Sequence, residues 1–266
     1  MSDLSPDLAR CAEALAQRRR DARVVARTGS TNDDARAWAQ SGAPHGAVVI
    51  ADTQERGRGR HGRAWSSPPG ESLALSVVLR PRVAPTALPP IALVAGLAAR
   101  SAVARRLSAP VAVKWPNDLL LDERGHLRKL AGVLVEGAIA GMRVDHVVVG
   151  IGINVARTEF PPELAHLATS LARAGATDLD RGSLALEVLD ALDEELAAWT
   201  LAPETIGSRL RPHDAILGRA VLLEGDVRGI ADGIDPDGRL RVRVDDELRR
   251  AHAGEVRLAR VTTDDG

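Results

Sequence analysis

The sequence predicts an α+β fold in which a mixed or antiparallel sheet with helices is followed by a small β-barrel. Several strand-like runs up to about residue 155 are joined by hairpins and only a few by helices, which favours antiparallel neighbours. From Gly218 onward, short strands alternate with glycine and Asp-Gly turns, and their number suits an SH3-like barrel. We therefore predict two domains, residues 1–212 and 213–266, with the boundary near Pro212.

The expected strands of the first domain are short apolar runs bounded by turn residues. They cover residues 23–26, 47–53, 73–79, 111–115, 129–136 and 146–155, with a hairpin over 119–127. The expected helices begin at proline or capping residues and carry apolar side chains at helical spacing. They cover residues 6–20, 33–40, 91–107, 183–199 and 203–210. The expected strands of the second domain cover residues 220–224, 228–234, 240–244, 248–252 and 255–260.

Composition excludes several classes of protein. The chain has 266 residues, 45% hydrophobic and 27% charged, which is typical of a globular protein. The net charge is −1, so polyanion binding must rely on local patches, and 2% aromatic content is too low for a base-stacking surface. Cys11 is the single cysteine, which excludes an internal disulfide. We find no apolar run of membrane-spanning length and no signal peptide, and we expect a cytoplasmic protein with no membrane partner.

Residues 54–65, with the sequence QERGRGRHGRAW, concentrate cationic side chains and glycines in one predicted loop. The glycines stand at 57, 59 and 62, and the arginines at 56, 58, 60 and 63. Glycine adopts positive φ at low cost, so successive backbone N–H groups can surround an anion, and arginine adds forked donors suited to phosphate or carboxylate. We therefore predict a loop that grips a phosphate and becomes ordered when a polyanion binds.

The same loop contains G-x-G-x-x-G, the spacing of a dinucleotide-binding fingerprint. That fingerprint requires a helix directly after the loop, but residues 66–70 read Ser-Ser-Pro-Pro-Gly and are turn formers. An acidic residue is also expected roughly 20 positions further on, where this chain has Arg82. A Rossmann fold is therefore excluded, whereas a solvated basic turn and an Arg-Gly segment that binds RNA remain open.

Polar residues also stand where other predicted strands begin or end. Lys114-Trp-Pro-Asn-Asp118 ends one strand, and Lys129 opens the next strand beyond a hairpin, so Lys129 can lie beside Asp118. Asn154 interrupts an apolar strand after two glycines that permit close approach of a flat group. Each feature, taken singly, is also explained by turn formation or by a buried amide with ordinary partners.

Ser30 and Thr31 precede a predicted helix, where they either cap the helix or present hydroxyl groups to a ligand. The seven histidines show no metal-ligand spacing, and the chain has no cysteine cluster. Neither a G-x-S-x-G elbow nor a Walker A motif occurs. Binding of a nucleotide would therefore need another phosphate cradle.

Five motifs occur in order along the chain. They are Ser30-Thr-Asn32, Gln54 with Gly57-Arg-Gly-Arg-His-Gly-Arg63, Lys114-Trp-Pro-Asn-Asp118, Lys129-Leu-Ala-Gly132 and Gly150-Ile-Gly-Ile-Asn154. Together they closely resemble the bacterial biotin protein ligases, over about residues 24–160 in motifs and nearly the whole chain with the small C-terminal barrel. The resemblance implies a class II synthetase-like catalytic domain, in a ligase of the monofunctional type without a DNA-binding domain. Lipoate–protein ligases share that fold but lack this Gly-Arg loop and the Lys-Trp-Pro-Asn-Asp motif.

The resemblance also implies the chemistry. Biotin and Mg-ATP form biotinyl-5′-AMP and pyrophosphate, and a lysine of a biotin carboxyl carrier protein then takes the biotinyl group. Because a carboxylate must attack a triphosphate of like charge, charge neutralisation and positioning are expected to supply most of the catalysis. The expected substrates and cofactors are biotin, ATP and Mg²⁺. The expected partner is the carrier protein, with no DNA, and the protein itself is a monomer or a homodimer.

Residue roles carry over to the matching positions. Lys129, Arg58 and Asp118 resemble the catalytic residues: Lys129 lies between carboxylate and α-phosphate, and Asp118 orients Lys129 and Arg58 and helps to hold magnesium. The positions implied to bind biotin are Ser30, Thr31, Asn32, Gln54, Gly57, Arg58, Gly59, Arg60, Lys129 and Gly150. The positions implied to bind ATP are Arg58, Arg60, Arg63, Trp65, Asn117, Lys129 and Asn154. His61 departs from the family, in which a further arginine is common, and this lowers the local positive charge.

Three alternatives remain beside this interpretation. A lipoate or octanoate ligase would share the fold, and an RNA-binding module would use the Arg-Gly loop for a different purpose. A transcriptional repressor is disfavoured, because one N-terminal helix cannot form a winged helix-turn-helix.

Overall fold

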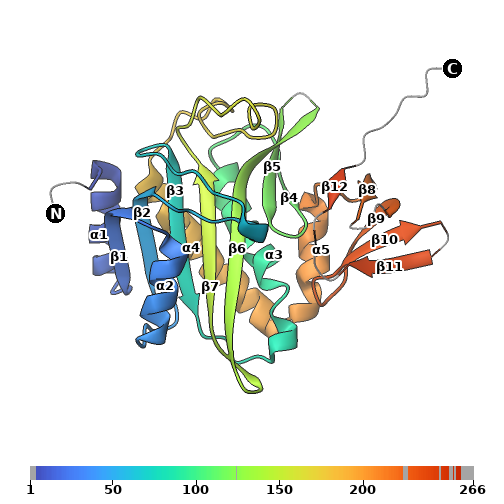
Figure 1. Ribbon diagram of the computed structural model, residues 1–266, viewed down its shortest axis with the longest axis horizontal. Coiled ribbons are helices and arrows are strands. Elements are labelled where there is room, and N and C mark those ends of the chain that lie inside the picture. The colour runs from blue at the N-terminus through green and yellow to red at the C-terminus, as the bar shows by residue number, and fades with distance from the viewer. Residues whose placement is uncertain are drawn as a thin grey trace.

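The computed structural model describes residues 4–123, 125–223, 227–245, 247–251, 254 and 256–258. The chain forms a seven-stranded sheet with helices on its faces and, beside it, a five-stranded antiparallel sheet (Figure 1). This arrangement confirms the predicted α+β fold class.

The seven-stranded sheet has the order β1-β2-β3-β7-β6-β5-β4. Its strands are β1 Ala22–Thr28, β2 Val48–Gln54, β3 Ser72–Leu79, β4 Val111–Lys114, β5 Asp118–Glu123, β6 His126–Ala140 and β7 Arg143–Asn154. Strands β1 and β2 are parallel, because helix α2 connects them, and all other neighbours in this sheet are antiparallel. The predicted mixed sheet is therefore confirmed, and so is the hairpin that joins β5 to β6.

The helices divide between the two faces of this sheet (Figure 1). They are α1 Pro6–Gln17, α2 Thr31–Gln40, α3 Ile91–Ala104, α4 Arg181–Leu201 and α5 Ile206–Leu210, with 3₁₀ turns η1 Arg60–Gly62, η2 Pro85–Ala87, η3 Pro203–Thr205 and η4 Arg211–His213. Helices α3 and α4 pack together over the main core, which is built from leucine, valine, isoleucine and alanine. Helix α2 covers part of the opposite face through a smaller, alanine-rich cluster. The remainder of that face holds the polar residues discussed below.

Strands β6 and β7 are longer than the sequence predicts. They pair from Ala131 opposite Ile153 to Ala140 opposite Arg143, across a segment that contains turn-forming Gly137. Local propensity favours a loop there, but the two strands satisfy each other's backbone hydrogen bonds and tertiary pairing prevails.

The five-stranded sheet has the order β11-β10-β9-β8-β12, with all neighbours antiparallel. Its strands are β8 Ala220–Leu222, β9 Arg228–Ile234, β10 Leu240–Val244, β11 Glu247–Ala251 and β12 Arg257–Leu258. Parts of three predicted strands, at residues 224, 252, 255, 259 and 260, lie outside the described residues. Barrel closure stays a prediction, because no pairing of β11 with β12 occurs among the residues that the structure describes.

The two sheets are connected by specific contacts near the predicted boundary. Asp214 forms a parallel bridge with Val113 of β4, beyond Pro212, the predicted last residue of the first domain. The buried indole Nε1 of Trp115 donates to the carbonyl of Gly238, 2.9 Å away, in the turn between β9 and β10. The loop that follows β4 therefore contacts the C-terminal sheet directly.

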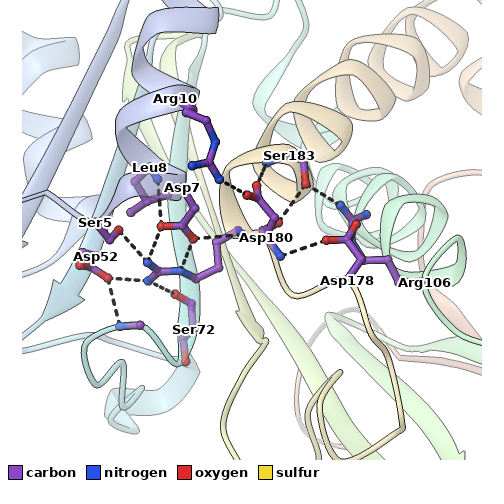
Figure 2. A network of polar contacts seen from close by, with 12 residues as sticks. Ser5, Asp7, Leu8, Arg10, Asp52, Ser72, Arg106, Asp178, Asp180 and Ser183 are labelled. Carbon is purple, nitrogen blue, oxygen red and sulfur yellow. Dashed lines mark hydrogen bonds and ion pairs between the residues drawn. The ribbon is translucent and has the colours of Figure 1, made fainter.

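Arg181, at the first turn of α4, is the centre of a buried ionic network. Its guanidinium donates to the Ser5 hydroxyl, to the carboxylates of Asp7 and Asp52 and to the carbonyl of Ser72, four residues that lie close together in Figure 2. The ion-pair distances are 2.8 Å to Asp7 and 2.5 Å to Asp52. Burial by itself raises the pKa of Asp7, but hydrogen bonds from Arg181 and Ser5 and the charge of Arg181 lower it to about 2. The network joins α1, α4 and the end of β2, two residues before Gln54.

One apolar helical segment qualifies by length and composition as a membrane span. It covers Pro85–Ala104. The prediction that no apolar run approaches membrane-spanning length is therefore wrong when only length and composition are considered. Most of the segment is buried, and α3 packs on α4 and on the sheet. Gly96 lets it approach β4 closely, because a Cβ there would lie 3.2 Å from Val113 Cγ1. Core helices satisfy the same criterion.

Candidate active site

A cavity of about 560 Å³ lies on the sheet face that α2 leaves uncovered. Its walls come from the start of α2, the Gly-Arg loop, strands β3, β5, β6 and β7, the segment 157–168, and residues 256 and 258 beside the C-terminal sheet. The sequence-predicted residues that line it are Ser30, Thr31, Asn32, Gln54, Arg58, Gly59, Arg60, Arg63, Trp65, Asn117, Asp118, Lys129, Gly150 and Asn154. Folding therefore brings five separate motifs to one cavity, and of the predicted residues only Gly57 lies outside its lining.

The start of α2 forms a buried polar end of the cavity. Ser30, Thr31 and Asn32 are all buried, and Ser30 occupies the N-cap position without a side-chain capping hydrogen bond. Gln54 Oε1 instead accepts the backbone N–H of Thr31 at 2.9 Å and lies 3.0 Å from the Thr31 hydroxyl. Ser30 is therefore the N-cap residue, as one of the two alternatives predicted, but neither hydroxyl group caps the helix, because the amide of Gln54 accepts the N–H of Thr31.

The glycines of β7 make room for side chains of the protein itself. A Cβ at Gly150 would lie 2.1 Å from Asn32 Oδ1, and a Cβ at Gly152 would lie 2.5 Å from the Trp65 indole. The expected close approach of a flat group is present, but the flat group is Trp65. At the end of β7, Asn154 is buried and donates to the carbonyl of Thr169 at 2.9 Å, so its amide has an ordinary partner.

Lys129 and Asp118 meet in the middle of the cavity wall. Lys129 Nζ lies 2.7 Å from Asp118 Oδ1 and 5.7 Å from the centre of the Trp65 ring. The pairing of β5 with β6 creates this contact, because Asp118 is opposite Gly132, three residues beyond Lys129. A Cβ at Gly132 would lie 3.1 Å from Lys129 Nζ, so the glycine leaves space for the ammonium group. The adjacency inferred from the hairpin is confirmed.

Arg58 has partners other than the predicted one. It pairs with Asp33 of α2 at 2.8 Å and with Glu136 of β6 at 3.0 Å. The expectation that Asp118 orients Arg58 is wrong for this structure. The sequence could not reveal these partners, because Asp33 and Glu136 come from elements far apart in the chain.

The Gly-Arg loop is held by backbone hydrogen bonds between its own two sides, and its N–H groups do not converge on an anion site as predicted. The N–H of Gly59 donates to Arg63 O, and the N–H of Trp65 donates to Gly57 O, so these two amides are used within the loop. Positive φ occurs at His61 and Gly62 only, and not at Gly57 or Gly59. Gly57 is needed for close packing instead, because a Cβ there would lie 2.4 Å from Trp65 O.

Arg60 connects the loop to two other parts of the cavity. Its guanidinium donates to Asn117 Oδ1 at 3.0 Å and to the carbonyl of Gly254 at 3.4 Å. Asn117 in turn donates to Val133 O on β6 at 2.8 Å. The loop, the turn after β4 and the C-terminal segment therefore meet at one side chain.

Several cavity residues were not found by sequence reasoning. Arg157 and Phe160 line the cavity and stack with 4.8 Å between guanidinium carbon and ring centre, and Glu136 and Ser76, behind the lining, bind the Asn32 amide. The only sequence signal for Ser76 was a hydroxyl within an otherwise apolar run, in a strand buried along its whole length. Glu136 had no signal, because a charged residue near a strand end is most simply solvated.

The carboxylates of the cavity do not form a metal cluster by themselves. No group of three or more His, Cys, Asp or Glu side chains suited to a metal occurs among the residues that the structure describes. Asp118 is a hard oxygen donor, but its Oδ1 is paired with Lys129. Such a site suits Mg²⁺ that is held largely by substrate phosphates and waters, with one protein carboxylate at most.

Comparison with known proteins identifies the family. Residues 24–154 match the biotin/lipoate A/B protein ligase family, and residues 216–258 match the biotin protein ligase C-terminal domain. The biotin–acetyl-CoA-carboxylase ligase of Mycobacterium tuberculosis is 40% identical over 242 residues, which cover 88% of this chain and 87% of that protein. This chain belongs to the biotin protein ligase family.

Two further relatives support the biotin protein ligase assignment. The bifunctional ligase/repressor BirA of Bacillus subtilis is 32% identical over 86% of this chain and 71% of its own length. The solved biotin protein ligase of Aquifex aeolicus in complex with biotin and ATP is 28% identical, with a TM-score of 0.74. That alignment covers 90% of this chain and 99% of the Aquifex chain, so the likeness extends across both sheets.

Proposed function

We propose that this biotin protein ligase activates biotin with ATP to form biotinyl-5′-AMP and pyrophosphate, and then transfers the biotinyl group to a lysine of a biotin carboxyl carrier protein. The observation that carries the proposal is the position of Lys129. Its ammonium group is held by Asp118 on the wall of a cavity that Thr31, Gln54, Trp65 and Asn117 also line. A cation held there can neutralise a carboxylate and an α-phosphate that otherwise repel each other.

Each group of cavity residues has a role in this proposal. Ser30, Thr31, Asn32 and Gln54 are polar, mostly buried and suited to a ureido ring, which both donates and accepts hydrogen bonds. Gly59 and Gly150 line the biotin end, and Gly57, outside the lining, lets the loop pack against Gln54. Arg58, Arg60 and Arg63 supply positive charge to the phosphates. Trp65, Asn117 and Asn154 form the nucleotide side, where the buried Trp65 Nε1 has no hydrogen-bond partner among the described residues.

Magnesium enters with ATP in this proposal. Asp118 is the residue that would contact the ion, and the ion would neutralise part of the triphosphate charge. The protein's own contribution is to keep Lys129 charged and directed, and to exclude water from the reactive mixed anhydride by ordering the Gly-Arg loop.

The remaining expectations are also proposals. We assign residues 1–212 to the catalytic domain and 213–266 to the C-terminal domain, in agreement with family matches that end at 154 and begin at 216. The described residues before β1 form one helix, which supports a ligase that does not bind DNA through this segment. We propose a cytoplasmic enzyme that acts as a monomer or homodimer on the carrier protein of an acyl-CoA carboxylase.

An ATP–pyrophosphate exchange assay tests the function. Biotin should stimulate exchange, whereas lipoate and octanoate should not, and an apo carrier protein should become biotinylated when it is added. Exchange that responds to lipoate but not to biotin would assign a lipoate ligase instead. Salt-dependent RNA binding without biotin-dependent exchange would favour the RNA-binding alternative.

A further inference from the structure

Asn32 lies across three strands at the buried polar end of the cavity. Ser76 of β3 and Leu134 of β6 are both register partners of Gly150 in β7, so the three residues form a row across the sheet. The Asn32 side chain lies over Gly150, where a Cβ would overlap it. It thereby connects Ser76 on one side of the row with Glu136, two residues beyond Leu134, on the other.

The carboxylate of Glu136 fixes which way the Asn32 amide points. Asn32 Nδ2 lies 2.8 Å from Glu136 Oε2 and 3.4 Å from Leu134 O, and both oxygens only accept hydrogen bonds. Arg58 holds the same carboxylate oxygen at 3.0 Å. Asn32 must therefore direct Nδ2 toward Glu136 and Oδ1 toward Ser76.

This orientation determines the direction of the next hydrogen bonds. Ser76 Oγ is completely buried and lies 2.6 Å from Asn32 Oδ1 and 2.8 Å from Thr31 Oγ1. A hydroxyl group has one hydrogen, and Asn32 Oδ1 can only accept, so the Ser76 hydrogen goes to Asn32. Thr31 receives no hydrogen from Ser76, and its own hydrogen goes to Ser76 Oγ or to Gln54 Oε1. The oxygen of Thr31 is left as an acceptor on the cavity wall.

We propose that Glu136 is a positioning residue for ligand specificity: it sets the hydrogen-bond direction along Asn32, Ser76 and Thr31 so that Thr31 Oγ1 accepts an N–H of a cyclic urea. The inference rests on the proposed biotin function and adds a residue that does not itself contact the ligand. If the Asn32 amide were reversed, Ser76 would donate to Thr31 and compete with a ligand N–H for the lone pairs of Thr31 Oγ1.

The variant Glu136→Gln tests this mechanism with little change in shape. A glutamine has one uncharged acceptor oxygen in place of a carboxylate, and Arg58 and Asn32 must share it, so the Asn32 amide is held less firmly and can reverse. The variant also weakens the ion pair with Arg58, which needs its own control. Asp33→Asn is that control, because Asp33 is the other carboxylate on Arg58, and no hydrogen bond joins its side chain to Asn32 among those of the described residues.

The measurement is equilibrium binding of biotin and of its cyclic carbonate analogue, in which both ureido N–H groups are replaced by oxygen. The wild-type protein should bind biotin more tightly than the analogue. Glu136→Gln should lower that affinity ratio about tenfold, which is about 1.4 kcal/mol, by weakening biotin binding more than analogue binding. Asp33→Asn should keep the wild-type ratio, even if it changes both affinities.

Two results would overturn this inference and leave the proposed function standing. They are a wild-type ratio of biotin to analogue affinity in Glu136→Gln, or an equal decrease of that ratio in Glu136→Gln and Asp33→Asn. A wild-type protein that binds no biotin would overturn the proposed function and the inference together. If Glu136→Gln does not fold, as judged by thermal unfolding, Ser76→Ala tests the same chain at its next member: it removes the hydroxyl that could donate to Thr31, so Thr31 Oγ1 stays an acceptor and the wild-type ratio should be kept. A lower ratio in Ser76→Ala would refute the mechanism.

Discussion

Replacing Asp7 by asparagine removes one carboxylate from the buried Arg181 network at a distance from the cavity. Asp7 receives two hydrogen bonds from the guanidinium, at 2.8 and 2.9 Å, and one from the backbone N–H of Arg181 at 3.2 Å. The change keeps the shape of the side chain but removes its charge. Arg181, which is itself buried, then retains Asp52 as its single ionic partner in the network.

The magnitude follows from the pKa of Asp7. The pKa falls from 3.8 to about 2 on folding, which corresponds to roughly 2–3 kcal/mol at about 1.4 kcal/mol for each tenfold step. Asp7 is partly accessible to solvent, and screening reduces this to roughly 1–2 kcal/mol. We therefore expect Asp7→Asn to lower the free energy of unfolding by roughly 1–2 kcal/mol at neutral pH.

The pH dependence has a definite sign. The pKa of Asp7 is lower in the folded protein, so its contribution is complete above the unfolded value of 3.8 and is lost as the pH falls through about 2. The stability difference between wild type and Asp7→Asn should therefore be constant near neutral pH. It should fall to about half by about pH 3, and disappear below the folded pKa.

Urea unfolding followed by circular dichroism between neutral pH and about pH 3 measures this difference. Asp190→Asn is a matched control, because Asp190 also joins α4 to α1, through an exposed ion pair with Arg18 at 2.7 Å. The control should cost less than about 0.5 kcal/mol. A difference for Asp7→Asn that does not change with pH, or that equals the control at neutral pH, would refute the reasoning.

Two further predictions concern the cavity and the contact between the sheets. Lys129→Ala should lower the rate of biotin-dependent pyrophosphate exchange by about 10²–10³-fold, because a positioned charge at the reacting groups is lost; Asp118→Asn should lower it less, because Lys129 remains. Exchange at the wild-type rate in Lys129→Ala would remove Lys129 from the chemistry. Trp115→Phe should lower the free energy of unfolding by about 1–3 kcal/mol, because the buried carbonyl of Gly238 loses its donor. Unchanged urea unfolding would show that this hydrogen bond does not stabilise the sheet contact.

Local patterns in the sequence were sufficient to locate most of the elements, and the chemistry came from the resemblance that the five motifs carry. Apolar runs with turn residues located the strands, and a hairpin between two strands placed Lys129 beside Asp118. Both inferences depend on residues close together in the chain, where spacing and turn geometry restrict the outcome. The extra length of β6 and β7 was not predicted, because it depends on the pairing of the two strands and not on local propensity.

The sequence by itself therefore determined the fold class, the five motifs and the family that they resemble. Only the tertiary structure decided the partners: Arg58 with Glu136 and Asp33, Asn32 over Gly150, and Trp65 over Gly152. The physical reason is register. Side chains from distant segments meet only when strand pairing fixes which residues lie opposite, and neither composition nor spacing along one strand contains that information.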